Sequence, residues 1–271
     1  MTTPDSDKLF SGSIPKLYEQ YLVPLIFQPY AEDLVARVAQ APGQRVLEIA
    51  AGTGVVTRAL AAALPADAQI VATDLNPAML QEAQSIGVSR PVEWKQADAM
   101  VLPFGDAGFD TVVCQFGVMF MPDKGKAFAE ARRVLRPGGR LIFNVWGGLD
   151  RNDIARIVHQ AVAALFPSDP PGFLGRTPYA YFHHDVIARD LAAAGFSTPA
   201  SFDVVSARSR ATPEDAAIGY VQGTPLRSEI EARDASRLAE ATGAAARAIA
   251  EAFGSGPIDA AIEAHVVTVT R

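Results

Sequence analysis

Cysteine and long apolar runs are both scarce in this 271-residue sequence. A single cysteine, Cys114, excludes an internal disulfide framework and any all-cysteine zinc or iron–sulfur site. No apolar stretch reaches the roughly 18–20 residues that span a bilayer, because proline, glycine or a charged residue interrupts every run. We therefore expect a protein without a membrane span.

Positive charge is also in short supply. The 30 acidic residues outnumber the 24 basic ones, which gives a formal net charge of −6. Binding to a nucleic-acid backbone needs a net or clustered basic surface, which this composition does not favour. The first residues also lack the apolar core and small-residue cleavage site of a secretory signal. We expect a cytoplasmic protein that does not bind nucleic acid.

The residues that are present favour one large α/β domain with an added cap. Apolar residues make up 49% of the chain and charged residues 20%, enough for a large core. From residue 45, strands alternate with helices, which is typical of a parallel sheet covered on both faces. The strands expected here are Arg45–Ile49, Gln69–Thr73, Val92–Gln96, Asp110–Gln115 and Arg140–Val145. Their carboxyl ends should share one edge, where ligands bind in such sheets.

The segments on either side of this alternation read as a lid and a cap. Residues 1–40 are expected to form a helical lid, which Pro24 and Pro29 should break into two pieces. Residues 41–148 are the expected cofactor-binding core, and residues 149–271 the substrate cap. The cap pattern predicts the strands Phe202–Ser206 and Ala264–Thr270, with a helical insertion at 213–253 between them. Aromatic residues are frequent near and within the cap: Trp146, Phe166, Phe173, Tyr179, Tyr181 and Phe182.

The strongest local signal is the run VLEIAAGTG at residues 46–54, in which a strand leads into a turn of small residues. A dinucleotide fingerprint would need a third glycine three residues after Gly54, and none is present. The carboxylate of Glu48 also lies in the approach to the turn, where it would repel a pyrophosphate. The pattern therefore favours a cofactor without phosphates that bears an amine or another positive group.

Acidic residues also end the next two strands. Asp74 follows the turn by about 20 residues, the offset at which a carboxylate binds ribose hydroxyls. Asp98 follows the third strand, where a carboxylate can accept a hydrogen bond from the exocyclic amine of adenine. Each acid alone could be a helix N-cap. Three acids at the ends of three successive strands argue for a nucleoside site.

Four motifs resemble the ordered motifs of class I S-adenosylmethionine-dependent methyltransferases: VLEIAAGTG, VATDLNPAML, QADAMVLPFGDAGFDTVVCQFGVMFMPD and RVLRPGGRLIFNVW. They are most similar to the branch of ubiquinone/menaquinone-biosynthesis C-methyltransferases. The resemblance covers roughly residues 40–148. It implies a Rossmann-like, doubly wound, mostly parallel seven-stranded sheet with an antiparallel last strand and helical caps at both ends. It also implies S-adenosyl-L-methionine as the cofactor.

The resemblance assigns the cofactor contacts. Glu48, Ala50 and Gly52 would line the methionine and ribose portion, with Glu48 near the ammonium end, and Asp74 would hold the ribose diol. Tyr21 of the lid would also contact the cofactor. Ala50 stands where the family usually has glycine, so a positive φ there would be strained. Further contacts around the adenine and the sulfonium would come from Leu75, Met79, Ala97, Asp98, Ala99, Gln115 and Phe116.

The substrate site is less defined by the sequence. Catalysis in this family rests mainly on placement, and a general base is needed only for a poor nucleophile. His183 and His184 are the candidates for such a base, although helix capping or simple exposure is the more common reason for such histidines. No cysteine or acid is spaced to complete a metal site with them. The expected substrate pocket consists of Tyr18, Phe27, Trp146 and Arg176.

These observations favour S-adenosylmethionine-dependent methyl transfer to a small molecule, aromatic or otherwise apolar, at O, N or C. Two alternatives stay open: an NAD(P)-dependent oxidoreductase, and a non-catalytic binding protein on the same fold. The sequence does not identify the methyl acceptor, and it does not decide between a monomer and a homodimer.

Overall fold

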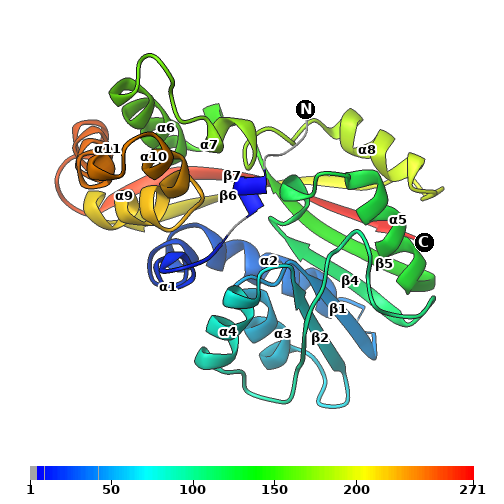
Figure 1. Ribbon diagram of the computed structural model, residues 1–271. Helices are drawn as coiled ribbons and strands as arrows, with labels where there is room; N and C mark the ends of the chain where they lie inside the picture. Colours follow the sequence, from blue (N-terminus) through cyan, green and yellow to red (C-terminus); the bar gives the residue numbers. More distant parts are fainter. Residues whose placement is uncertain (1–4, 9, 42) are drawn as a thin grey trace.

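The computed structural model describes residues 5–8, 10–41 and 43–271 (Figure 1). Within this part of the chain, seven strands form one sheet in the order β3-β2-β1-β4-β5-β7-β6. The strands are β1 Arg45–Ile49, β2 Gln69–Asp74, β3 Glu93–Gln96, β4 Phe109–Gln115, β5 Leu135–Trp146, β6 Ser201–Ala211 and β7 Ile258–Thr270. The first five are parallel, and β7 runs antiparallel to both β5 and β6. The expected mostly parallel sheet with an antiparallel last strand is confirmed.

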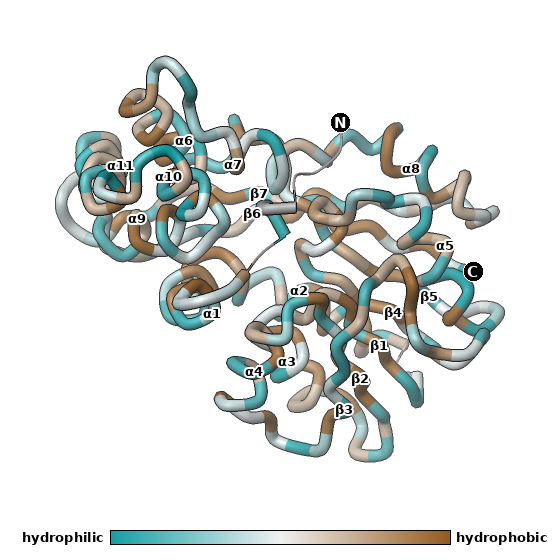
Figure 2. The backbone as a smooth tube through the Cα atoms, in the orientation of Figure 1, coloured by the Kyte–Doolittle hydropathy of each residue, from teal (hydrophilic) through white to brown (hydrophobic). Residues whose placement is uncertain are grey.

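The middle of the sheet is buried on both faces. Val46 and Leu47 of β1 and Val112 and Val113 of β4 have no exposed surface. Because both faces are covered, these strands are runs of apolar residues without alternation, which is visible as brown segments in Figure 2. The covering helices of this half are α2 Gln28–Ala39, α3 Val55–Ala63, α4 Pro77–Ile86, α5 Lys124–Val134 and α8 His184–Ala193. Helices α2 and α3 pack on each other, as do α5 and α8.

The N-terminal helical segment is continuous, which corrects the expected break. Helix α1, Ile14–Leu17, runs into a π-helical stretch, Tyr18–Phe27, that continues into α2. Pro24 lies inside this stretch. A proline ring clashes with the carbonyl four residues earlier in an α-helix, and the wider π turn accommodates that carbonyl. The proline therefore changes the type of helix without ending it.

The cap gathers at one end of the long β6–β7 ribbon (Figure 1). Its helices are α6 Asp153–Leu165, α7 Phe173–Arg176, α9 Pro213–Gln222, α10 Leu226–Asp234 and α11 Leu238–Phe253. Short 3-10 turns complete the described structure: η1 Asp5–Lys8, η3 Val118–Phe120, η4 Leu149–Arg151 and η5 Ala235–Arg237. Helix α11 packs on α6 and α9, and α9 packs on the π-helical stretch. The cap is thus joined to the N-terminal segment as well as to the sheet.

Both ribbon strands are longer than the sequence pattern indicated. Their pairing continues from Ser201 opposite Thr268 to Ala211 opposite Ile258. The outer part of β6 contains Arg208 and Arg210 and lies beyond the end expected at Ser206. In the structure both arginines pair with Asp259 of β7. Among the described residues, no helix is long and apolar enough to cross a membrane.

Candidate active site

One large cavity lies at the carboxyl edge of the sheet, between the core and the cap. It holds about 1250 Å³ of empty space, including the part that is open to solvent. Residues from the ends of β1, β2, β4 and β5 line it, together with residues of the N-terminal segment and the cap. Of the residues expected at the site, those that line the cavity are Tyr18, Phe27, Ala50, Gly52, Asp74, Leu75, Met79, Ala97, Asp98, Ala99, Gln115, Phe116 and Trp146.

The turn after β1 bends the backbone back toward the cavity. Ala50, Gly52 and Gly54 all have positive φ angles, of 55°, 56° and 84°. For Ala50 this left-handed conformation costs roughly 1–2 kcal/mol more than it would for a glycine at the same position. Strain of this kind persists where the surrounding structure holds it, and such positions cluster at functional sites. The strain foreseen for Ala50 is therefore present at the wall of the cavity.

Asp74, at the end of β2, fixes this turn. Its Oδ2 accepts a hydrogen bond from the Gly52 N–H at 2.8 Å, and its Oδ1 accepts one from the Asn76 N–H at 2.8 Å. Burial raises the pKa of Asp74 above its ordinary value, while these backbone donors act in the opposite direction. The carboxyl is 7% exposed and lines the cavity, so its remaining lone pairs can accept hydrogen bonds from a ligand.

Asp98 lies across the same part of the cavity. Its Oδ1 accepts a hydrogen bond from the Met100 N–H at 2.8 Å, which folds the chain after β3 into a tight turn. Ala97 and Ala99 flank it on the lining, and Leu75 and Met79 lie on the β2–α4 side. Small residues beside one carboxylate and apolar side chains on the other side suit a flat ring with an exocyclic amine.

The end of β4 carries a second strained residue. Phe116 has a φ of 49°, and its N–H donates to the Asn144 Oδ1 at 2.9 Å. Its ring stacks on Trp146 with the centroids 3.7 Å apart and the planes at 5°. Beside it, the Gln115 Oε1 is buried and has no hydrogen-bond partner among the described residues. An unpaired buried acceptor on the lining is a position that a ligand donor would satisfy.

The far part of the cavity is an aromatic chamber, which we define by its six rings: Phe27, Phe116, Trp146, Phe173, Tyr179 and Tyr220. The Trp146 ring contacts Phe27 and Tyr179, with centroids 5.9 Å and 5.8 Å apart. Asp74 on β2 and Trp146 on β5 are three strands apart in the sheet, which corresponds to about 14 Å. The carboxylates and the chamber therefore form two separate halves of one cavity.

Sequence reasoning did not assign several chamber residues to the site. Phe173 and Tyr179 belong to the aromatic set near the cap, but nothing in their spacing distinguishes them from core residues. Tyr220 lies in α9, inside the expected insertion, and nothing in its neighbourhood marks it. Phe10 also lines the cavity, and its N–H donates to the Asn76 Oδ1 at 3.3 Å. Only the fold brings these distant segments together.

Glu48, which the resemblance places near the cofactor, is not among the residues that line the cavity. Its side chain is 1% exposed and accepts a hydrogen bond from the Thr57 hydroxyl at 2.5 Å. It points into the packing between β1 and α3, because side chains alternate along a strand while the ligand lies beyond the strand's end. Burial raises the pKa of Glu48 to about 8.

Glu48→Gln should flatten the pH dependence of stability. Because the folded pKa is about 8 and the ordinary value is 4.5, the folded protein holds a proton that the unfolded chain releases. The stability this proton contributes is fully present below pH 4.5 and is lost as the pH rises through 8. Melting temperatures measured from pH 4 to 9 should fall more steeply for the wild type than for the variant. The control Glu93→Gln changes an exposed carboxyl of β3. Parallel curves for wild type and Glu48→Gln would contradict the buried, protonated carboxyl.

Three other expected site residues also lie outside the lining. Tyr21 packs closely against Gly219 of α9: a side-chain carbon added at Gly219 would lie 3.2 Å from the Tyr21 Cβ. His183 is exposed at the start of α8. The His184 Nε2 lies 3.0 Å from the His265 Nδ1, and its ring stacks on Phe202. His184 thus lies by β6 and β7, and neither histidine lines the cavity, so neither is placed to act as a base there.

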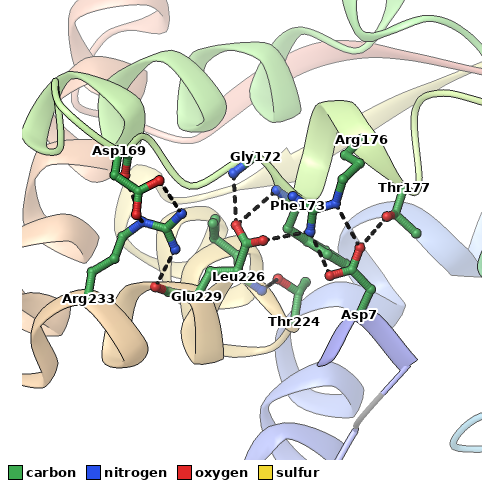
Figure 3. A network of polar contacts seen from close by, with 10 residues as sticks. All are labelled: Asp7, Asp169, Gly172, Phe173, Arg176, Thr177, Thr224, Leu226, Glu229 and Arg233. Atoms are coloured by element: carbon green, nitrogen blue, oxygen red, sulfur yellow. Dashed lines mark hydrogen bonds and ion pairs between the residues drawn. The ribbon is translucent and has the colours of Figure 1, made fainter. Parts of the chain in front are cut away.

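Arg176 forms part of a polar network beside the cavity, which replaces its expected role as a substrate anchor (Figure 3). Its Nη2 lies 2.7 Å from the Asp7 Oδ1 and 2.6 Å from the Glu229 Oε1. Thr177 also donates to Asp7, which has no exposed surface. Glu229 in turn accepts from the N–H groups of Gly172 and Phe173 at the start of α7. The network fastens η1 to α7 and α10.

This fastening places a strap across the cavity. We define the strap as residues 5–8 and 10–13, the described part of the chain before α1. Lys8 and Phe10 line the cavity from it, and the Phe10 ring contacts Tyr18 and Phe120. Figure 1 shows η1 near the cap and the chain passing from it to α1. The strap is thus held to the cap at Asp7 and to the core at Asn76.

Solved structures define the class of fold. The [4+2]-cyclase SpnF is 19% identical with a TM-score of 0.59, over 100% of this chain and 98% of that one. YcgJ of Bacillus subtilis is 18% identical with a TM-score of 0.56, over 90% and 98%. Phosphoethanolamine N-methyltransferase 2 of Haemonchus contortus, solved with phosphomonomethylethanolamine and S-adenosylhomocysteine, is 18% identical with a TM-score of 0.58, over 95% and 56%. At these identities the likeness shows the fold alone.

Sequence relatives identify the core more closely. Residues 47–143 match the methyltransferase domain family. The ubiquinone/menaquinone biosynthesis C-methyltransferase UbiE of Teredinibacter turnerae is 36% identical over 138 residues, 49% of this chain and 51% of the relative. An uncharacterized protein of Mycobacterium tuberculosis is 39% identical over 126 residues, 45% and 44%. The chain spans about half the length of the curated relatives it matches. The resemblance seen in the motifs is confirmed: residues 47–143, which carry the motifs, match the methyltransferase domain family and lie in the part of the chain similar to a C-methyltransferase.

Proposed function

We propose that this protein transfers a methyl group from S-adenosylmethionine to a small, largely apolar aromatic molecule at O, N or C. The observation that carries the proposal is that one cavity is lined both by the carboxylates after β2 and β3 and by the aromatic chamber beside β5, three strands away from β2 in the sheet. Asp74 and Asp98 lie in the half that suits a nucleoside, and the aromatic chamber forms the other. A methyl donor and a methyl acceptor would therefore meet between them, at Gln115 and Phe116 on the end of β4.

The residues of the first half fit the cofactor. Asp74 would accept hydrogen bonds from the ribose hydroxyls, and Asp98 one from the adenine amine. The unpaired Gln115 Oε1 is an acceptor without a protein donor, as a bound ammonium or hydroxyl group requires. When bound, S-adenosylmethionine supplies an electrophilic methyl group. The work of the protein is then to orient the acceptor in line with that group and to exclude water.

The chamber residues favour catalysis by placement. Among the described lining residues, the only carboxylates are Asp74 and Asp98, and no histidine is present. Both carboxylates lie in the half opposite the chamber, so neither is placed as a base for an acceptor bound there. The aromatic rings provide a dry, rigid wall that holds an apolar acceptor without competing with its nucleophile.

A nucleotide-dependent oxidoreductase is less well supported by the turn after β1. The Gly52 N–H, which would face a pyrophosphate in a dinucleotide site, already donates to Asp74. A carboxylate at that point repels phosphate. Helix α3 begins at Val55 without the third glycine that a dinucleotide site uses.

Titration calorimetry with S-adenosylhomocysteine and, separately, with NADH tests the cofactor. We expect binding of the first and none of the second; the reverse would overturn the proposal. Because a [4+2]-cyclase shares this fold, binding alone does not establish methyl transfer. Incubation with isotopically methyl-labelled S-adenosylmethionine and a panel of naphthols and naphthylamines should give products that carry the label, detected by mass spectrometry. Cofactor binding without label transfer to any aromatic acceptor would favour a non-catalytic protein.

A further inference from the structure

Two tyrosines in the aromatic chamber form its only hydroxyl pair among the described residues. Tyr179 follows α7, and Tyr220 lies in α9. Their hydroxyl oxygens are 3.4 Å apart, and the residues are 4% and 2% exposed. Both line the cavity, so this pair is the polar feature that an acceptor in the chamber would meet.

The pair has one more donor hydrogen than the protein uses. Burial raises the pKa of Tyr220 to about 12 and that of Tyr179 well above its ordinary value, so both hydroxyls stay protonated. One hydrogen lies between the two oxygens, and the second has no acceptor among the described residues. The nearby hydroxyls are engaged elsewhere: Thr224 donates to the Tyr220 carbonyl at 2.7 Å, and Tyr30 to the Val205 carbonyl at 3.3 Å.

We propose that the Tyr179–Tyr220 pair anchors the methyl acceptor by donating a hydrogen bond to a neutral oxygen of it, a carbonyl or an ether. A buried donor without a partner loses free energy, and an acceptor oxygen in the chamber would remove that loss. An anionic oxygen is disfavoured, because none of the six chamber residues carries a positive charge to offset its desolvation. The identity of this ligand as the methyl acceptor rests on the proposed function.

The pair also sets where the acceptor lies relative to the cofactor half. Tyr179 contacts Trp146, which stacks on Phe116 at the end of β4. An aromatic molecule held at the tyrosines by its oxygen would therefore extend along Trp146 and Phe116 toward the cofactor half. The anchored oxygen is then a positioning group, and the methylated atom lies elsewhere on the molecule.

Two planar probes of nearly equal shape test the anchor: 2-acetylnaphthalene, which carries a carbonyl oxygen, and 2-isopropenylnaphthalene, which carries a methylene in its place. Affinities are measured by ligand-detected NMR on the full chain saturated with S-adenosylhomocysteine. The double variant Tyr179→Phe/Tyr220→Phe should weaken binding of the ketone about 3- to 10-fold. Its affinity for the alkene should stay within about 2-fold of the wild-type value. Each variant is compared with the wild type on the same probe. The different hydration of the two probes therefore cancels in each comparison.

Tyr181→Phe is the matched control, because its hydroxyl donates to Asp190 and the residue does not line the cavity. It should leave both affinities unchanged. If the double variant does not fold, Tyr179→Phe and Tyr220→Phe are measured separately, and the ketone-specific loss is expected in the one whose hydroxyl donates to the ligand. Equal losses for ketone and alkene, or no loss for either, would overturn the anchor. Calorimetric titration with S-adenosylhomocysteine alone reports the cofactor half separately, so a failure of the proposed function is distinguishable from a failure of the anchor.

Discussion

Asp74→Ala is expected to weaken S-adenosylhomocysteine binding by about 1.5–3 kcal/mol, the scale of lost charge-assisted hydrogen bonds. Two effects act together. The variant lacks the carboxylate proposed to hold the ribose, and it frees the Gly52 N–H that Asp74 now binds at 2.8 Å. Calorimetric titration gives the change in dissociation constant directly. Asp74→Asn removes the charge but keeps one oxygen, which can accept from Gly52 or from Asn76 but not from both.

Asp67→Ala is the control for this experiment. Asp67 is an exposed aspartate just before β2, at the opposite end of the strand from Asp74. Its removal alters the net charge equally but lies far from the cavity lining, so the dissociation constant should not change. An unchanged constant in Asp74→Ala itself would reject the ribose assignment. A loss of equal size in Asp67→Ala would point to a general charge effect.

Arg176→Ala is expected to release the strap. Removing one partner of a buried ion pair costs about 3–5 kcal/mol, because the other charge is left uncompensated. Asp7 has no exposed surface and would avoid that cost by leaving its site together with η1. Since Arg176 is itself about a third exposed, we expect the lower end of the range. The readout is hydrogen exchange of the Phe10 amide, bonded to Asn76, which should speed up about 10- to 100-fold.

Arg233→Ala tests whether this effect is specific. Arg233 belongs to the same network but pairs with Asp169, whose side chain is 76% exposed. Exposed pairs contribute little, so Phe10 exchange should stay at the wild-type rate. Adding Asp7→Asn to Arg176→Ala removes the unpaired charge and should slow the exchange again. Unchanged Phe10 exchange in Arg176→Ala would show that the strap does not depend on the ion pair.

The parts of the fold that follow from local patterns could be predicted from the sequence. Strands β1, β2 and β4 are short apolar runs bounded by turn residues, so their positions and parallel pairing were foreseen. The outer half of β6 was missed because Arg208 and Arg210 make it polar. It pairs with the start of β7, some 50 residues later, where Asp259 forms ion pairs with both arginines. An ion pair across a ribbon leaves no trace in local hydropathy.

The same distinction applies to the site. Asp74 and Asp98 follow strands whose ends must meet at one edge, so their position on one cavity could be inferred from topology. Glu48 was placed there by the same logic, but it occupies a strand position that faces α3. Tyr220 and Tyr179 come from cap segments whose packing no periodicity specifies. His184 looked available for chemistry until the structure paired it with His265.

The face-to-face stack of Trp146 on Phe116 has a spectroscopic consequence. The chain has two tryptophans, and the other, Trp94, lies on β3 beside Gly54. The Trp146 indole lies in the aromatic chamber and stacks on Phe116, which borders the cofactor half, so its fluorescence should change when a ligand fills the chamber or displaces Phe116. Replacing Trp94 by phenylalanine would leave that single fluorophore, and the order in which the two ligands arrive could be followed without any label.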